Sequence, residues 1–207
     1  MLRKRWAKVL VFVAGLAPIF WLCWRAWNQN LTANPIEYIT RSTGYWTLAF
    51  LLITLTVTPL RRLTGWNWLL RMRRMLGLFA FFYVCLHFTT YIWLDQFFDV
   101  PGMLKDIAKR PFITVGFSAF LLLIPLAATS TNAMVKRLGS RRWQLLHRLV
   151  YVIATLGVLH FWWLVKKDIT EPLIFGTLLG LLLLARLVYL ARKATPSAPP
   201  TARSQTA

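Results

Sequence analysis

Acidic residues are scarce in this sequence, and their scarcity argues against several kinds of membrane protein. The 207 residues contain only six Asp and Glu against 25 Lys and Arg, and none of the six lies in the middle of a long apolar run. Proton pumps and ion carriers usually need carboxylates buried within the membrane. The sequence therefore disfavours a carboxylate-based pump or carrier.

Cysteines and phosphate-binding motifs are also sparse. The two cysteines, Cys23 and Cys85, lie in separate apolar runs. They offer no disulfide framework and no metal-binding pair, and each is expected to pack as a small apolar side chain. The sequence has no Ser/His/Asp set, no glycine-rich phosphate loop and no cysteine cluster. It therefore argues against a self-contained hydrolase or kinase.

Apolar residues, by contrast, are abundant and come in long runs. They make up 57% of the chain, and the mean hydropathy is +0.54, above the usual range for soluble domains. Each run approaches the roughly 20 residues that cross a hydrocarbon core, and in lipid each must be helical because every backbone group needs an internal partner. We therefore predict an all-α integral membrane bundle of about six transmembrane helices, near Val9–Trp27, Gly44–Leu60, Met75–Leu94, Phe112–Ala128, Leu145–Val165 and Leu173–Leu190.

The basic residues are distributed unevenly between the two ends of these helices. The net charge of +19 does not indicate a nucleic-acid partner, because the charges sit between apolar runs, where anionic lipid headgroups are the expected counter-charge. The two chain ends and the connections 61–74 and 136–148 hold 18 of the 25 Lys and Arg, whereas all six acids lie at the other side. The positive-inside rule then predicts that both termini are cytoplasmic. We expect one membrane domain over residues 1–193 and a disordered cytoplasmic tail over 194–207.

The three histidines carry the clearest chemical signal. His87 lies in the third predicted helix, and His147 and His160 lie in the fifth. The two helices run in the same direction, and His87 follows Arg74 by 13 residues just as His160 follows His147. Two imidazoles at one height on neighbouring helices can hold a planar b-type haem between them, because neutral imidazole suits iron and adds no buried charge. We therefore predict that His87 and His160 are axial ligands of haem iron in the outer half of the membrane.

His147 suggests a second, inner haem site. On an ideal helix it lies about 20 Å from His160 and about 140° around the axis, so the two do not share a face. The corresponding level of the third helix is occupied by Arg73 and Arg74. We expect Arg73 to face the inner haem and to pair with a propionate. The alternatives are an ordinary basic anchor at the membrane surface for Arg73 and a helix-bridging hydrogen bond for a histidine.

Three stretches around these residues match a known family. They are RMRRMLGLFAFFYVCLHFTTY at Arg71–Tyr91, RPFITVG at Arg110–Gly116, and Ser130–Trp163, which includes an L-G-x-x-x-W-x-x-L-H run from Leu138 to His147. With them the chain resembles the MsrQ (YedZ) family of haem-binding membrane subunits of the bacterial MsrPQ methionine-sulfoxide reductase system. That family belongs to the ferric-reductase-like transmembrane superfamily. The resemblance covers nearly the whole chain except the tail.

The resemblance implies a specific function in the bacterial inner membrane. Members of the family pass electrons from quinol to a periplasmic molybdenum-cofactor methionine sulfoxide reductase, which repairs oxidised periplasmic proteins. Catalysis on the sulfoxide would then occur in that partner. The implied cofactors are one or two b-type haems, with His87, His147 and His160 as ligand candidates, and FMN, for which the sequence has no assignable motif. Two-haem members of the superfamily carry two histidines on each of two helices, and this chain lacks the fourth.

Two functions of other classes stay open. A transporter of metals or small solutes could use the histidines, and it predicts flux in proteoliposomes without any chromophore. A passive membrane anchor could hold a periplasmic enzyme, and it predicts that a variant without histidines still supports that enzyme. The lack of acids within the membrane disfavours the first, and the matched heights of His87 and His160 disfavour the second.

Overall fold

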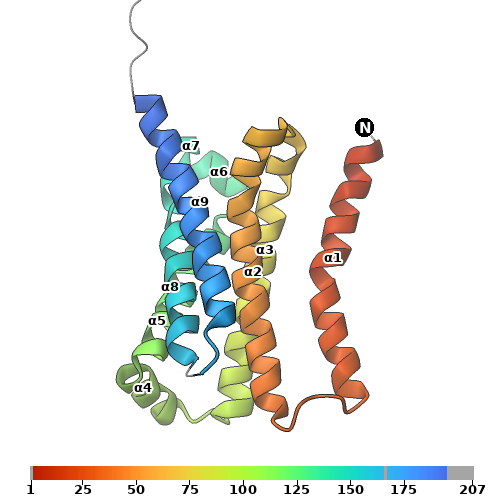
Figure 1. Ribbon diagram of the computed structural model, residues 1–207, viewed down its shortest axis with the longest axis vertical. Coiled ribbons are helices and arrows are strands. Elements are labelled where there is room, and N and C mark those ends of the chain that lie inside the picture. The colour runs from red at the N-terminus through yellow and green to blue at the C-terminus, as the bar shows by residue number, and fades with distance from the viewer. Residues whose placement is uncertain (1, 166, 195–207) are drawn as a thin grey trace, which may run out of the picture.

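The computed structural model describes residues 2–165 and 167–194, and within them it contains helices and no strand (Figure 1). The predicted all-α membrane bundle is confirmed, because six segments are long and apolar enough to cross a bilayer. The predicted tail lies outside the described residues from position 195 onward. The six segments are Trp6–Trp27, Pro35–Thr64, Arg73–Asp95, Pro111–Ala128, Ser140–Leu164 and Thr170–Arg192.

The helices of the described residues follow one another with short connections. A 3₁₀ turn over Asn67–Arg71 precedes α3, and a π-helical turn over Tyr91–Asp95 extends it. The α-helices are α1 (Leu2–Trp27), α2 (Pro35–Thr64), α3 (Arg73–Thr90), α4 (Val100–Lys109), α5 (Pro111–Ala128), α6 (Asn132–Leu138), α7 (Ser140–His147), α8 (Leu149–Leu164) and α9 (Thr170–Ala194).

The helix ends differ from the hydropathy-based ranges for a local reason. Helix α2 begins at Pro35 because the Asn34 side chain accepts a hydrogen bond from the Glu37 amide, and it ends before Gly65, whose φ of 72° suits glycine. Hydropathy marks only the part of a helix that lies in hydrocarbon, whereas caps set where the helix stops. The fifth predicted helix is also two helices, since α7 and α8 are separated at Arg148.

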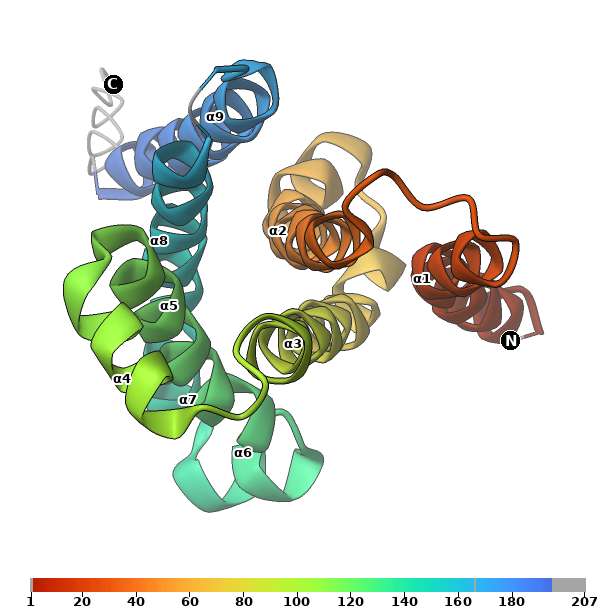
Figure 2. The ribbon, with the colours of Figure 1, turned by 90° about the horizontal axis from the view of Figure 1, so that it is seen from below.

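Two helix pairs form the centre of the bundle. Helices α2 and α3 pack together, as do α5 and α8, and α9 packs against both α2 and α8 (Figures 1 and 2). The core of the first pair includes stacked rings, with ring centroids 5.3 Å apart for Phe50 and Phe79 and 5.4 Å apart for Phe50 and Tyr83. These contacts fix the α2–α3 pair as a unit.

Helix α1 lies at the edge of the bundle (Figure 2). The Tyr83 hydroxyl of α3 donates to the Gly15 carbonyl at 2.8 Å and accepts from the Ile19 amide at 3.2 Å. Gly15 also lets the Phe79 ring approach closely, because a Cβ at that position would lie 2.4 Å from it. A few contacts therefore hold α1 to α3.

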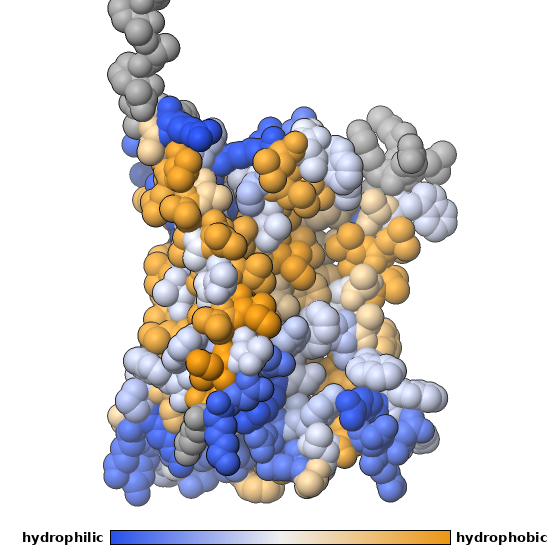
Figure 3. Space-filling view, in the orientation of Figure 1, coloured by the Kyte–Doolittle hydropathy of each residue, from blue (hydrophilic) through white to orange (hydrophobic). Residues whose placement is uncertain are grey.

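The surface of the molecule matches a bilayer. On the face shown in Figure 3, apolar side chains form a broad band across the middle, and polar side chains gather toward both ends. We call the end where α2, α5 and α9 finish the basic end, since Arg61, Arg62, Arg73 and Arg74 lie there. The opposite end, with α4 and residues such as Glu37 and Asp106, is the acidic end.

Candidate functional site

The imidazoles of His87 and His160 meet between two helices that come from different pairs. His87 lies three residues before the end of α3, and His160 lies four before the end of α8. Their ring centroids are 6.2 Å apart, and the ring planes stand at 79°. Both side chains are half-buried. The structure thus brings these two predicted residues together, near the acidic end.

A backbone carbonyl orients each imidazole. The Nδ1 atom of His87 lies 2.9 Å from the Thr40 carbonyl of α2, and that of His160 lies 2.6 Å from the Phe112 carbonyl of α5. A carbonyl oxygen only accepts, so each Nδ1 carries the proton of a neutral ring. The Nε2 lone pairs are thereby left available, and a hydrogen bond of this kind is how proteins hold a metal-binding histidine in place.

A glycine one helical turn beyond each carbonyl leaves room for the ring. A Cβ at Gly44 would lie 3.0 Å from Cε1 of His87, and a Cβ at Gly116 would lie 2.7 Å from Nδ1 of His160. Both helices thus use the same arrangement, a carbonyl at one residue and a glycine four residues later. A Cβ at Gly116 would force the His160 ring to move, and a Cβ at Gly44 would require the His87 ring to move by a few tenths of an ångström.

The donor set fits axial ligation of a metal within a macrocycle. An imidazole nitrogen binds a metal at about 2 Å, so two rings on opposite sides of one metal atom have centroids roughly 6 Å apart. The observed separation of 6.2 Å agrees with this value. In the described part of the chain no group of three or more His, Cys, Asp or Glu gathers as a metal site. Two imidazoles alone suit a metal whose other ligands come from a porphyrin.

His147 lies at the other end of the bundle, and its surroundings differ. Its Nε2 lies 3.1 Å from Oγ1 of Thr129, and that hydroxyl donates to the Pro125 carbonyl at 2.6 Å. The hydroxyl therefore accepts from Nε2–H, which leaves Nδ1 as the nitrogen with a lone pair. The ring stacks on Trp143 at 3.9 Å between centroids. His147 thus connects the end of α7 to the end of α5, at the basic end of the bundle.

Arg73, the predicted partner of an inner haem, lies at the same end of the bundle as His147, and the site there has only one imidazole. Arg73 and Arg74 both interact electrostatically with His147. Arg73 is half-buried and also interacts electrostatically with Tyr151 and Arg186. The inner site therefore combines one histidine with several guanidinium groups, unlike the paired imidazoles at the acidic end.

Sequence reasoning missed the groups that hold the imidazoles. The carbonyls of Thr40 and Phe112 have no sequence signature, since any residue supplies one. In the sequence Gly116 appeared only as the last residue of the matched stretch Arg110–Gly116, and Gly44 only as the first residue of a predicted helix. Neither position indicated that a glycine would face an imidazole of another helix.

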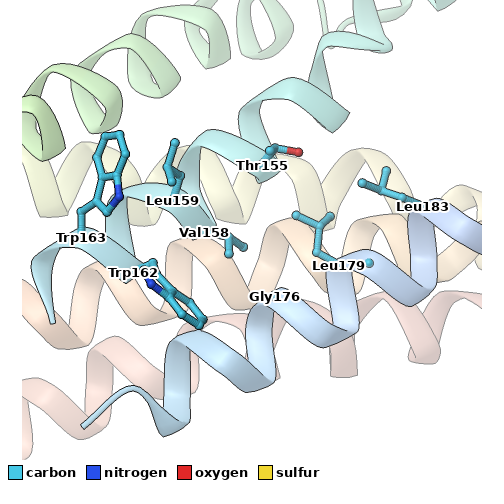
Figure 4. Close-up of a pocket in the computed structure, with 9 residues that line it drawn as sticks. Thr155, Val158, Leu159, Trp162, Trp163, Gly176, Leu179 and Leu183 are labelled. Atoms are coloured by element: carbon cyan, nitrogen blue, oxygen red, sulfur yellow. The ribbon is translucent and has the colours of Figure 1, made fainter. Parts of the chain in front are cut away.

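An open groove is lined by residues that neighbour His160 in the sequence (Figure 4). It has a volume of about 480 Å³ and lies between α8 and α9, where Trp162 of α8 extends toward α9 near Gly176. Trp162 and Trp163 follow His160 by two and three residues. The groove is lined by Thr155, Val158, Leu159, Trp162, Trp163, Gly176, Leu179, Gly180 and Leu183.

Comparison with known proteins identifies relatives along almost the whole chain. Residues 42–158 match the family model described as ferric reductase like transmembrane component. A relative from Herminiimonas arsenicoxydans is 64% identical over 188 residues, which cover 90% of this chain and 86% of the relative. One from Rhodospirillum rubrum is 57% identical over 92% of both chains, and one from Ralstonia nicotianae is 54% identical over 94% of this chain and 90% of the relative. All three carry the name protein-methionine-sulfoxide reductase heme-binding subunit MsrQ.

Proposed function

Because the chain belongs to the ferric-reductase-like transmembrane family and, within it, to the MsrQ subunits, we propose that it is the haem-binding membrane subunit of a bacterial methionine-sulfoxide reductase system. The observation that carries this proposal is the His87–His160 pair, with 6.2 Å between ring centroids and each Nδ1 bound to a carbonyl. These two residues would hold a b-type haem. When bound, that group supplies reversible one-electron storage within the membrane.

The chain's own residues prepare the site for that role. The Thr40 and Phe112 carbonyls fix the tautomer and direction of each ring. Both imidazoles are neutral, so the site adds no fixed charge to the membrane interior. Gly44 and Gly116 hold the neighbouring helices close enough for these hydrogen bonds to form.

The orientation of the bundle in the membrane follows from its charge asymmetry. We place the basic end and both chain termini in the cytoplasm and the acidic end in the periplasm of a bacterial inner membrane. His87 and His160 then lie near the periplasmic surface, within a few residues of their helix ends. Electrons held there would be passed to a periplasmic molybdenum-cofactor methionine sulfoxide reductase, on which oxidised proteins are repaired.

Quinol is the proposed electron donor. A quinol is dissolved in the bilayer and would reach the protein from its lipid-facing side. The groove between α8 and α9 opens on that side, has mainly apolar lining, and carries Trp162 and Trp163 close along the chain to His160. An aromatic ring at such a place can stack on a quinone ring.

Two further cofactor assignments belong to the proposal. His147 and Arg73 are the candidates for a second haem, which would have a single imidazole ligand because no second histidine is available there. FMN is proposed on the family resemblance alone.

The proposal is tested on the protein purified in detergent from cells that supply haem. A Soret band is expected in the wild type, and His87→Ala and His160→Ala are each expected to lose the haem of the acidic end. His147→Ala is the matched control and keeps that haem. A wild type without a Soret band, or full haem content in both variants, would show the assignment to be wrong.

The same material distinguishes the other two functions. A metal or solute transporter would give flux in proteoliposomes without a chromophore. A passive anchor would let a variant with all three histidines replaced support methionine sulfoxide reduction in membranes as well as the wild type does. Either outcome would contradict an electron-transfer role.

A further inference from the structure

Three arginines from three helices converge at the basic end. Arg62 of α2 and Arg186 of α9 line a small pocket together with Tyr151 of α8. Arg73 of α3 interacts electrostatically with both Tyr151 and Arg186. The pocket has a volume of about 20 Å³, enough for one group the size of a water molecule. Its remaining lining is mainly apolar: Leu55, Thr58, Pro59, Leu182, Leu183 and Ala185.

Aromatic rings hold two of these guanidinium groups in the pocket. The Arg62 guanidinium lies 3.3 Å from the centroid of the Tyr189 ring, and that of Arg186 lies 6.0 Å from the centroid of the Tyr151 ring. Cation–π contacts of this kind fix the direction of an arginine side chain. A simple surface anchor would instead extend freely into the headgroup region. Arg62 is exposed and Arg186 is half-buried, so the two guanidinium groups have fixed directions at the surface where α2, α8 and α9 meet.

Within the described residues, the cluster has no acidic partner. The two ion pairs found there, Glu37–Arg41 and Asp106–Arg110, both lie at the acidic end. All six acids of the chain lie in segments that the sequence places at the opposite side of the bundle, so none can reach the arginines. Like charges that are brought together in a partly buried place repel one another, and an external anion removes that cost.

We propose that Arg62 and Arg186 bind the phosphate group of a ligand that enters from the membrane leaflet at the basic end. The planar guanidinium forms paired hydrogen bonds with phosphate oxygens. The pocket has room for one phosphate oxygen at most, so the rest of the phosphate and of the ligand must lie at its mouth and outside it. Leu182 and Leu183 of α9 line the pocket and lie about one helical turn nearer the middle of the bundle than Arg186, where the apolar part of a lipid would lie. This arrangement suits an anionic phospholipid, and a soluble phosphate ester such as FMN offers the same headgroup chemistry.

The experiment compares the wild type with the double variant Arg62→Gln/Arg186→Gln. Native mass spectrometry counts bound phosphatidylglycerol and, separately, bound phosphatidylcholine as the zwitterionic control. We expect the double variant to bind about tenfold less phosphatidylglycerol than the wild type, because two charge-assisted contacts to phosphate are lost. Arg192→Gln is the matched control, since Arg192 is an exposed arginine about 120° around α9 from Arg186 and should leave binding unchanged.

A second arm identifies the source of the phosphate. FMN and inorganic phosphate are titrated into the same proteins, and loss of FMN binding in the double variant alone would assign the site to a soluble phosphate ester. The variant Arg186→Lys keeps the positive charge but loses the planar guanidinium, so it should bind the phosphate ligand with intermediate strength. Such a graded loss would show that weaker binding in the double variant is not caused by misfolding. Equal binding of both lipid and FMN by wild type and double variant would overturn the proposal. Haem content is measured on the same samples. A protein without haem would contradict the haem assignment, and unchanged phosphate binding would contradict this site, so the two results can be told apart.

Discussion

Replacing Gly116 with alanine tests whether the imidazole of His160 is held as the structure indicates. The new Cβ would lie 2.7 Å from Nδ1, 2.8 Å from Cε1 and 3.1 Å from Cγ of His160. Ordinary van der Waals contact begins at 3.4 Å, so the ring must move by about 0.7 Å. A metal–nitrogen bond tolerates a change of only about 0.2 Å. The displaced ring would lose its hydrogen bond to the Phe112 carbonyl, and on the proposed function it would bind haem iron less well.

The expected result is a graded series across three glycines. Gly116→Ala should lose most of the haem bound at the acidic end. Gly44→Ala should lose less, since its Cβ would lie 3.0 Å from Cε1 of His87 and a shift of a few tenths of an ångström is enough. Gly77→Ala is the matched control on α3, where the nearest atom is Cγ2 of Thr54 at 4.0 Å. Its haem content should be unchanged, and its helix should be stabilised by up to about 1 kcal/mol.

The assay is the haem-to-protein ratio of each purified variant, with the redox potential of the bound haem as a second measurement. Size-exclusion chromatography shows whether each variant is folded and monodisperse. Gly116→Ala with full haem and an unchanged potential would refute the reasoning, because the imidazole would then have room that the structure does not give it. Loss of haem in Gly77→Ala to the same extent would equally contradict it.

Three further predictions follow from single contacts. Thr129→Val removes the hydroxyl that accepts a hydrogen bond from His147. If His147 holds a second haem, this variant should change the haem-to-protein ratio or the spectrum of that second haem. The haem assigned to His87 and His160 should be unaffected. Tyr83→Phe removes both bonds to α1 and should lower the free energy of unfolding by about 0.5–1.5 kcal/mol in thermal unfolding, without loss of haem. Trp162→Ala should slow the reduction of haem by a soluble quinol analogue without changing the haem content. Replacing Trp24, an exposed tryptophan of α1, with alanine should not slow it. Equal rates in the two variants would exclude the groove as the quinol site.

The fold was predictable from the sequence because the forces that set it are local. A run of apolar residues must be helical in lipid whatever its neighbours are, so six spans could be counted without tertiary information. The ends of α2 and the break between α7 and α8 were not predictable from hydropathy, since they depend on caps and on polar segments outside the hydrocarbon. The short helices α4 and α6 escaped notice for the same reason.

From the sequence one could predict that His87 and His160 lie at one height, because a helix rises by a constant amount per residue and its charged ends indicate where it leaves the hydrocarbon. The fold was needed to show that the two ring centroids lie 6.2 Å apart, that Thr40 and Phe112 supply the orienting carbonyls, and that Gly44 and Gly116 give the rings room. The rotation of a helix about its axis and its distance from a neighbour depend on side-chain packing between segments far apart in the chain. No count of residues along one helix contains that information.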